Sequence, residues 1–492
     1  MASPSDTGEE IEALDSVHVE TLLKAVENAG QKSGCTIRIF EKNDFYYYFH
    51  ADADLAAQFT YGSSSAIKTM GKKTPVSFCV MNYSNFEKLL RHLLLVRAFR
   101  VEIFKFLAGK AGSAPSYHLE VRASPGNISA IEHIVYGEGE PGGRDSNFLV
   151  GIKVNPSLVD GQVSLGLAAL DPSLNVVRVT ELQDSQHLHT LEAILVQLGP
   201  REVLLPDCDS AAVKKISDLV SRNKILVTER PSKEFSPLTE TEITRMFSSK
   251  SNTTELVKPE SLSCGALSGV CKFLNIDTTN TNTPTKFCME PLSSSTLMRL
   301  TGRTMKSLNV FPSPINPNHP SIFSILNQTR TPGGGRLLQQ WLKTPLMDSV
   351  MINERLNLVE LMVTNTEMRQ LLWEDHLRKF PDFQRLSAKF GSSKATLQDM
   401  YKVYVAVAKL EGLISCLQEN NGEEADHFVT LQDNFIKDLQ EANKDFEKFQ
   451  QMVETTIDLK QVEQGHFMIR PGWLVPVPCQ SRLNVSHYLL RF

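Results

Sequence analysis

The feature that most constrains the fold is a change in the spacing of apolar residues along the chain. In 397–417 and 431–457, apolar side chains recur at steps of three and four. Such stripes cover one face of a helix and are buried against a partner helix. Between 149 and 230 the apolar runs are short and separated by turn residues, which favours a layered sheet. A chain of 492 residues is therefore expected to form several domains of different class.

The middle of the chain carries a strand-rich pattern. Asp, Pro and Asn turns separate the apolar runs Leu149–Val154, Val163–Leu170 and Val176–Thr180, which predict three consecutive antiparallel strands. Helices and strands then alternate: helix Leu188–Leu198, strand Glu202–Leu205, helix Ala211–Val220 and strand Ile225–Thr228. Three antiparallel strands followed by this alternation resemble a ribonuclease-H-like layered sheet.

The N-terminal part, residues 1–125, has a mixed α/β pattern. We expect a strand at Thr36–Phe40, a helix over 85–99 with one apolar face, and paired strands near 101–104 and 117–121. The intervening Gly109–Ser116 segment is a plausible hairpin loop.

A glycine-rich break interrupts the predicted helices at Ser321–Asp348. This stretch is expected to open as a helix, to break at Thr331–Gly335, and to resume as an amphipathic helix that ends at Thr344 and Pro345. The apolar face of the second helix would be formed by Leu337, Leu338, Trp341 and Leu342.

Four segments, in order, resemble the MutS family of DNA mismatch-repair proteins, in the pattern of its eukaryotic MutS homologue 2 branch. They are Phe40–Ala57 (FEKNDFYYYFHADADLAA), Ala123–Asn127, Ser321–Asp348 with Leu300–Phe311 just before it, and Phe449–Pro471. The resemblance implies a multidomain chain: an α/β mismatch-binding-like domain at 1–125, an α/β ribonuclease-H-like connector at 126–296, the first half of an all-α lever at 297–471, and a tail at 472–492 that does not follow the family.

In mismatch readers of this family, a Phe-x-Glu motif enters the minor groove and the ring stacks on the mispaired base. Here the Phe falls on Phe45, but the Glu position is Tyr47. The resemblance therefore implies a supporting subunit, with Phe45 and Tyr46 as candidate DNA contacts. The alternative interpretation is that the aromatic residues of this segment are strand and core side chains.

Basic residues suggest where the DNA backbone would be held. Lys68, Lys72 and Lys73 lie in the 62–75 loop, where cations would neutralise phosphates and make binding depend on salt. An ordinary solvated surface is the alternative. The net charge of −5 is unlike that of a generic nucleic-acid binder, although a local groove can still be basic.

Several catalytic and metal-binding classes are disfavoured. The phosphate-cradling GxxxxGK[ST] loop does not occur, and Thr331–Arg336 lacks its Lys-Ser/Thr pair. A two-metal nuclease needs an acid on the first strand, whereas Asp171 and Asp184 follow later strands, where turn roles are expected. His187 and His189 are two residues apart, whereas metal-binding pairs on a helix favour a spacing of four. They are therefore expected to be polar residues at the start of a helix. The chain is thus expected to be no enzyme and to hold no cofactor or metal, and its eight scattered cysteines to be structural thiols.

The resemblance also implies partners and location: mismatched duplex DNA, MutS homologue 6 or 3 in a heterodimer, a MutL-type protein, no membrane, and the nucleus. The family pattern stops at Pro471, before the expected clamp and the ATPase that binds ATP and Mg²⁺. We therefore expect the apolar stripes between Phe383 and Asp458 to be partly uncovered. Two functions stay open: mismatched-DNA binding within a heterodimer, or an interaction fragment that binds repair partners through the connector without gripping DNA.

Overall fold

The chain folds into two compact units in the computed structural model. The first falls within residues 1–142 together with 224–226, and the second comprises the rest. The structure describes residues 16–32, 35–71, 75–107, 115–128, 130–131, 134–135, 147–155, 162–247, 257–276, 287–292, 298, 300–312, 319–391, 395–419, 429 and 431–462. In this described part, no helix is both long and apolar enough to cross a membrane.

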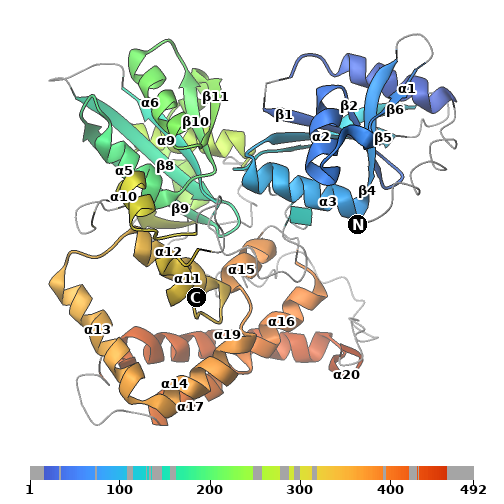
Figure 1. The fold of residues 1–492 in the computed structure, drawn as a ribbon. Helices are drawn as coiled ribbons and strands as arrows, with labels where there is room; N and C mark the ends of the chain where they lie inside the picture. Colours follow the sequence, from blue (N-terminus) through green and yellow to red (C-terminus); the bar gives the residue numbers. More distant parts are fainter. Residues whose placement is uncertain are drawn as a thin grey trace. The chain divides into compact units, whose positions relative to one another are not determined.

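A six-stranded sheet with the order β3-β4-β2-β1-β5-β6 forms the first unit. Its elements are α1 (Ser16–Asn28), β1 (Thr36–Lys42), β2 (Phe45–Phe49), α2 (Ala51–Tyr61), β3 (Lys68–Met70), β4 (Val76–Asn82), α3 (Tyr83–Arg91, continued by a π-helical turn at His92–Val96), β5 (Arg100–Leu107) and β6 (Ser116–Ala123). β1 pairs with β5 in parallel and the other neighbours are antiparallel. These positions confirm the predicted strands and helix (Figure 1).

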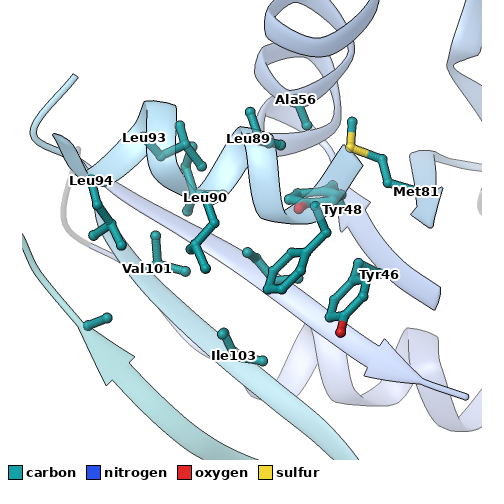
Figure 2. Close-up of a cluster of buried hydrophobic side chains, with 14 of the residues drawn as sticks. Tyr46, Tyr48, Ala56, Met81, Leu89, Leu90, Leu93, Leu94, Val101 and Ile103 are labelled. Carbon is teal, nitrogen blue, oxygen red and sulfur yellow. The ribbon is translucent and has the colours of Figure 1, made fainter. Parts of the chain in front are cut away.

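Successive side chains of a strand point to opposite faces of the sheet. In this sheet both faces are covered by other elements. Tyr46 and Tyr48 point to the face covered by α2 and α3, where the leucines of α3 and its π turn pack on Val101 and Ile103 (Figure 2). Tyr47 and Phe49 point to the other face, where they join a cluster that includes Leu22 of α1. An aromatic run with no polar alternation thus fits a strand that is covered on two sides.

A second six-stranded sheet, with the order β11-β10-β7-β8-β9-β12, begins the second unit. Its strands are β7 (Leu149–Val154), β8 (Val163–Asp171), β9 (Val176–Asp184), β10 (Glu202–Asp207), β11 (Leu226–Pro231) and β12 (Cys288–Pro291), and its helices are α5 (His189–Leu198), α6 (Ala211–Arg222), α7 (Glu240–Met246) and α9 (Leu262–Phe273). β7, β8 and β9 are antiparallel, and β10 runs parallel to β7. The predicted strand–helix order of this region is confirmed.

Helices form the remainder of the second unit. They are α10 (Gly302–Ser307), α11 (Ile322–Leu326), α12 (Pro332–Lys343), α13 (Ser349–Thr364), α14 (Thr366–Leu371), α15 (Phe383–Gly391), α16 (Leu397–Val407), α17 (Leu410–Glu419), α19 (Lys437–Thr456) and α20 (Leu459–Val462). A multidomain chain with α/β parts followed by a helical part is therefore confirmed.

The expectation that the two apolar stripes would be partly uncovered holds only for Phe435 and for the half-buried Leu397, Met400, Tyr404 and Leu439. α16 and α17 pack against α19, and Val403, Leu410, Phe446 and Val453 are fully buried in one shared core. Among the stripe positions predicted from the sequence, all of them described, only Phe435 is exposed. Exposed apolar side chains lie elsewhere in this region, for example Val350, Leu356, Val359 and Val363 on α13 and Leu337 and Trp341 on α12.

The expected break in the lever helices is shifted. Thr331 caps α12 by accepting a hydrogen bond from the backbone N–H of Gly334 at 3.1 Å, and Pro332 occupies the first turn. The glycines are therefore helical, and the break falls at 327–331. The predicted apolar face is confirmed only in part, since Leu338 and Leu342 are half-buried but Leu337 and Trp341 are exposed, while Arg336 is buried.

Candidate DNA-contacting region

Phe45 lies at the end of a tight hairpin. Asn43 and Asp44 both have positive φ, as a two-residue turn of the type favoured between twisted strands requires, and Lys42 pairs directly with Phe45. Phe45 is half-buried, whereas the next four residues of β2 are buried. The sheet therefore holds this ring rigidly at its edge while leaving part of it accessible.

Tyr46 is a core aromatic. Its ring stacks on Phe86 with a centroid separation of 3.7 Å and an interplanar angle of 1°. Burial raises the pKa of the Tyr46 hydroxyl well above its usual range, with Glu41 and Asp44 adding to the effect. Its position favours the alternative interpretation, in which this aromatic supports the sheet.

Tyr47, at the position where a mismatch reader carries Glu, is buried on the opposite face of β2 from Tyr46. A phenol in the core cannot replace a carboxylate that accepts a hydrogen bond from a base. This site can therefore offer an aromatic surface through Phe45, but it lacks the carboxyl that reads the mispaired base.

Lys68 is the one predicted backbone-contacting lysine that the described residues contain. It begins β3, an edge strand, where it pairs with Phe78 of β4 and is half-buried. Lys72 and Lys73 lie outside the described residues. The phosphate-contacting role of all three lysines stays a prediction.

The turn roles expected for the acidic residues of the connector sheet are confirmed. Asp171 accepts hydrogen bonds from the backbone N–H of Asn147 at 2.7 Å and from the N–H and hydroxyl of Ser173 at 3.0 Å and 2.7 Å. Asp184 accepts from Leu191 at 2.8 Å, near the start of α5. Both carboxylates are buried, and their oxygens accept these hydrogen bonds from turn and helix-start residues.

Metal-binding side chains do not gather in the described residues, which contain no group of three or more His, Cys, Asp or Glu suited to an ion. His187 and His189 are exposed where α5 begins, with ring centroids 5.7 Å apart. Their position confirms the polar helix start. Cys264 and Cys271 are buried thiols on α9.

The sequence interpretation left several elements without a prediction, among them α9 and β12. α9 contains Cys264 and Cys271, and Ser261 caps it by accepting a hydrogen bond from the backbone N–H of Cys264 at 3.1 Å. Ser261 was thus the residue from which the start of α9 could have been predicted. β12 spans Cys288–Pro291 and pairs in parallel with β9, a distant partner that no local pattern indicates.

Comparison with known proteins gives consistent matches along the chain. Family models described as MutS domain I, MutS domain II and MutS domain III match residues 21–132, 147–285 and 303–469. The chain is 30% identical to the DNA mismatch repair protein msh-2 of Neurospora crassa, over 91% of this chain and 47% of that protein. It is 27% identical to the DNA mismatch repair protein spellchecker 1 of Drosophila melanogaster, over 94% of this chain and 50% of that protein. The chain thus spans about half the length of these curated relatives.

Proposed function

Because the chain belongs to the MutS family, in its Msh2 branch, we propose that it acts in DNA mismatch repair as the supporting subunit of a mismatched-DNA-binding heterodimer. The observation that carries the supporting role is the replacement of the base-reading carboxylate by Tyr47, which is buried in the core of the sheet. A subunit built in this way can support the duplex through Phe45 while its partner reads the mispaired base.

The partners follow from the family. We propose MutS homologue 6 or 3 as the second subunit, a MutL-type protein as a further partner through the connector, and the nucleus as the location. ATP and Mg²⁺ would be used by the family's ATPase, and we assign no residue of this chain to them. Binding to duplex would be largely electrostatic and would weaken with salt.

The experiment is a titration of fluorescent duplexes, with and without one mismatch, against the chain together with its proposed partner subunit. We expect Phe45→Ala to weaken binding of both duplexes about tenfold, since a base–aromatic stack is worth about 1–3 kcal/mol. Tyr61→Ala is the matched control, because Tyr61 is an exposed aromatic at the end of α2 in the same unit. Equal losses in the two variants would count against a specific role for Phe45.

A second arm measures the salt dependence of the same titration. Lys68→Gln is expected to reduce the slope of log affinity against log salt by about one phosphate contact. An unchanged slope would assign Lys68 to the ordinary surface.

The alternative function, an interaction fragment without DNA grip, is favoured by the integrity of the connector sheet, whose six strands are all described. It predicts capture of a MutL-type protein by the chain under conditions in which no duplex binds. Salt-sensitive duplex binding by the chain alone would support the first function instead.

A further inference from the structure

Three helices of the second unit surround a cavity of about 490 Å³. It lies between the start of α5, the C-terminal half of α6 and α10, which is drawn in yellow beside α5 in Figure 1. Four cationic side chains line this cavity, Lys215, Arg222, Arg303 and Lys306, with Glu192 as its single lining carboxylate. The two exposed imidazoles of His187 and His189 complete the rim.

Buried residues fix the two helices that carry these cations. α6 buries Ile216 and Leu219 in the unit, so Lys215 and Arg222 lie on its outer side. α10 buries Met305, and Thr301 caps it by accepting from the N–H of Thr304 at 3.3 Å.

Gly302 shows how closely α10 approaches its neighbours. A Cβ at this position would meet Val196 Cγ2 of α5 at 3.5 Å and the side-chain oxygen of Asn223 at 3.6 Å, which is ordinary van der Waals contact. The packing of α10 against its neighbours thus brings the cations of α6 and α10 into one cavity.

Positive charge exceeds negative charge in this cavity, since four cations and one carboxylate line it. Among the residues that the structure describes, no carboxylate forms an ion pair with Lys215, Arg222, Arg303 or Lys306. The chain as a whole is acidic, with a net charge of −5. Like charges that converge on a concave surface repel one another and raise the local potential, and a bound anion relieves that repulsion.

The chemistry of the lining points to phosphate. Guanidinium groups bind phosphate oxygens through two parallel N–H donors, and ammonium groups add point charges. Arg222 donates its Nε hydrogen to the carbonyl of Asp218 at 3.3 Å, which orients the guanidinium and leaves its terminal nitrogens for a ligand. We propose that this cavity binds a compact soluble anion that carries two or more phosphate groups.

The shape of the site favours a small ligand over a nucleic-acid backbone. Its volume falls in the range of roughly 300–1,000 Å³ typical of small-molecule pockets. A duplex is convex and presents its phosphates along an extended line. It is therefore expected to bind an extended row of cations rather than a single cavity. Because α6 lies within the match to MutS domain II and Arg303 begins the match to domain III, the bound anion links residues of the two domains.

The test is isothermal titration of the full chain with tripolyphosphate at about 0.15 M salt, where weak surface attraction is screened. We expect one saturable site per chain and a midpoint of thermal unfolding that rises with ligand concentration. Arg303→Glu and, separately, Lys215→Glu are expected to weaken binding at least about tenfold. Since these side chains are exposed on different helices, unaltered melting of either variant without ligand establishes that its fold is intact.

Lys214→Glu is the matched control. It reverses a charge on the same helix, but Lys214 faces Asp209 at 3.1 Å and does not line the cavity. The proposal is overturned if this variant loses as much affinity as Lys215→Glu, or if the unaltered chain shows no saturable binding. Displacement of tripolyphosphate by a short duplex at lower phosphate concentration would also overturn it, because the cavity would then belong to a DNA-backbone surface.

Discussion

The guanidinium of Arg336 donates two hydrogen bonds to the carboxylate of Asp382, at 2.6 Å and 2.8 Å. A third bond reaches the side-chain oxygen of Gln384 at 2.7 Å. Arg336 lies in α12 and Asp382 directly precedes α15, and the arginine side chain is only 8% exposed. The ion pair therefore joins two helices of the lever region inside the protein.

Removal of Arg336 is expected to be costly, because it leaves the Asp382 carboxylate in a partly dry site with only the longer ion-pair contact to Arg385 at 3.7 Å. Arg336→Met should lower the free energy of unfolding by about 3–5 kcal/mol, measured by urea titration with tryptophan fluorescence. Lys437→Met is the control, since Lys437 pairs with Asp433 on the exposed surface and should cost less than about 1 kcal/mol. Equal costs would contradict a structural role for the buried pair.

The hydroxyl of Tyr48 is expected to oppose folding. This side chain is fully buried, and its oxygen has no hydrogen-bond partner among the described residues. Tyr48→Phe removes an unpaired polar group and should raise the free energy of unfolding by about 1–3 kcal/mol, which chemical denaturation will measure. Tyr404→Phe serves as the comparison, because it deletes a hydroxyl that donates to Glu454 at 3.0 Å. A loss of stability in Tyr48→Phe would show that the oxygen has a partner.

Gly166 sets the distance between β8 and α9. A Cβ there would come within 2.1 Å of the backbone carbon of Leu262 and 2.3 Å of the nitrogen of Ser263, so the helix would have to move. Gly166→Ala is expected to cost more than about 2 kcal/mol through overpacking, seen as a lower midpoint of unfolding. Gly302→Ala should be tolerated, because its Cβ meets only ordinary contacts from 3.5 Å outward.

Alkaline pH should destabilise the connector through its buried thiols. Burial raises the pKa of the Cys271 thiol to about 12, from an ordinary value near 9. The unfolded chain therefore loses this proton first, so the stabilisation is complete below about pH 9 and is lost as pH rises toward 12. Cys271→Ala should reduce the fall in unfolding free energy between about pH 8.5 and 10.5, where each such thiol contributes up to about 1.4 kcal/mol per pH unit. The exposed Cys208→Ala is the comparison variant, because it also removes one thiol but creates no cavity in the core.

α13 is expected to promote self-association. Val350, Leu356, Val359 and Val363 are each more than half exposed on this helix, and clustered apolar surface of this kind drives association. Leu356→Glu should shift sedimentation velocity profiles of the concentrated chain toward monomer, whereas Glu354→Gln on the same helix should not. Profiles of the unaltered chain that do not change with concentration would contradict this expectation.

Local spacing was sufficient to predict β7 to β11 of the second sheet and β1, β5 and β6 of the first. The Val163–Leu170 run became β8, and the helix predicted at Ala211–Val220 became α6, because a period of two or of 3.6 residues belongs to each segment alone. α9 and β12 were missed for different reasons. α9 is buried on all sides from Ser263 to Cys271, so it has no separate apolar face, while β12 is four residues long and owes its strand conformation to pairing with β9.

The sequence by itself determined the family, the order of the domains and the apolar periodicity of each element, since these properties are carried by residues close together in the chain. The tertiary structure alone decided which faces are covered. It buried Arg336 beside Asp382 and exposed Trp341. It packed the apolar stripes of α16 and α19 against each other. It also brought Lys215 and Arg303 to one cavity. The burial of a side chain and the charges around it depend on which distant segments pack together. Local spacing of residues does not specify that packing.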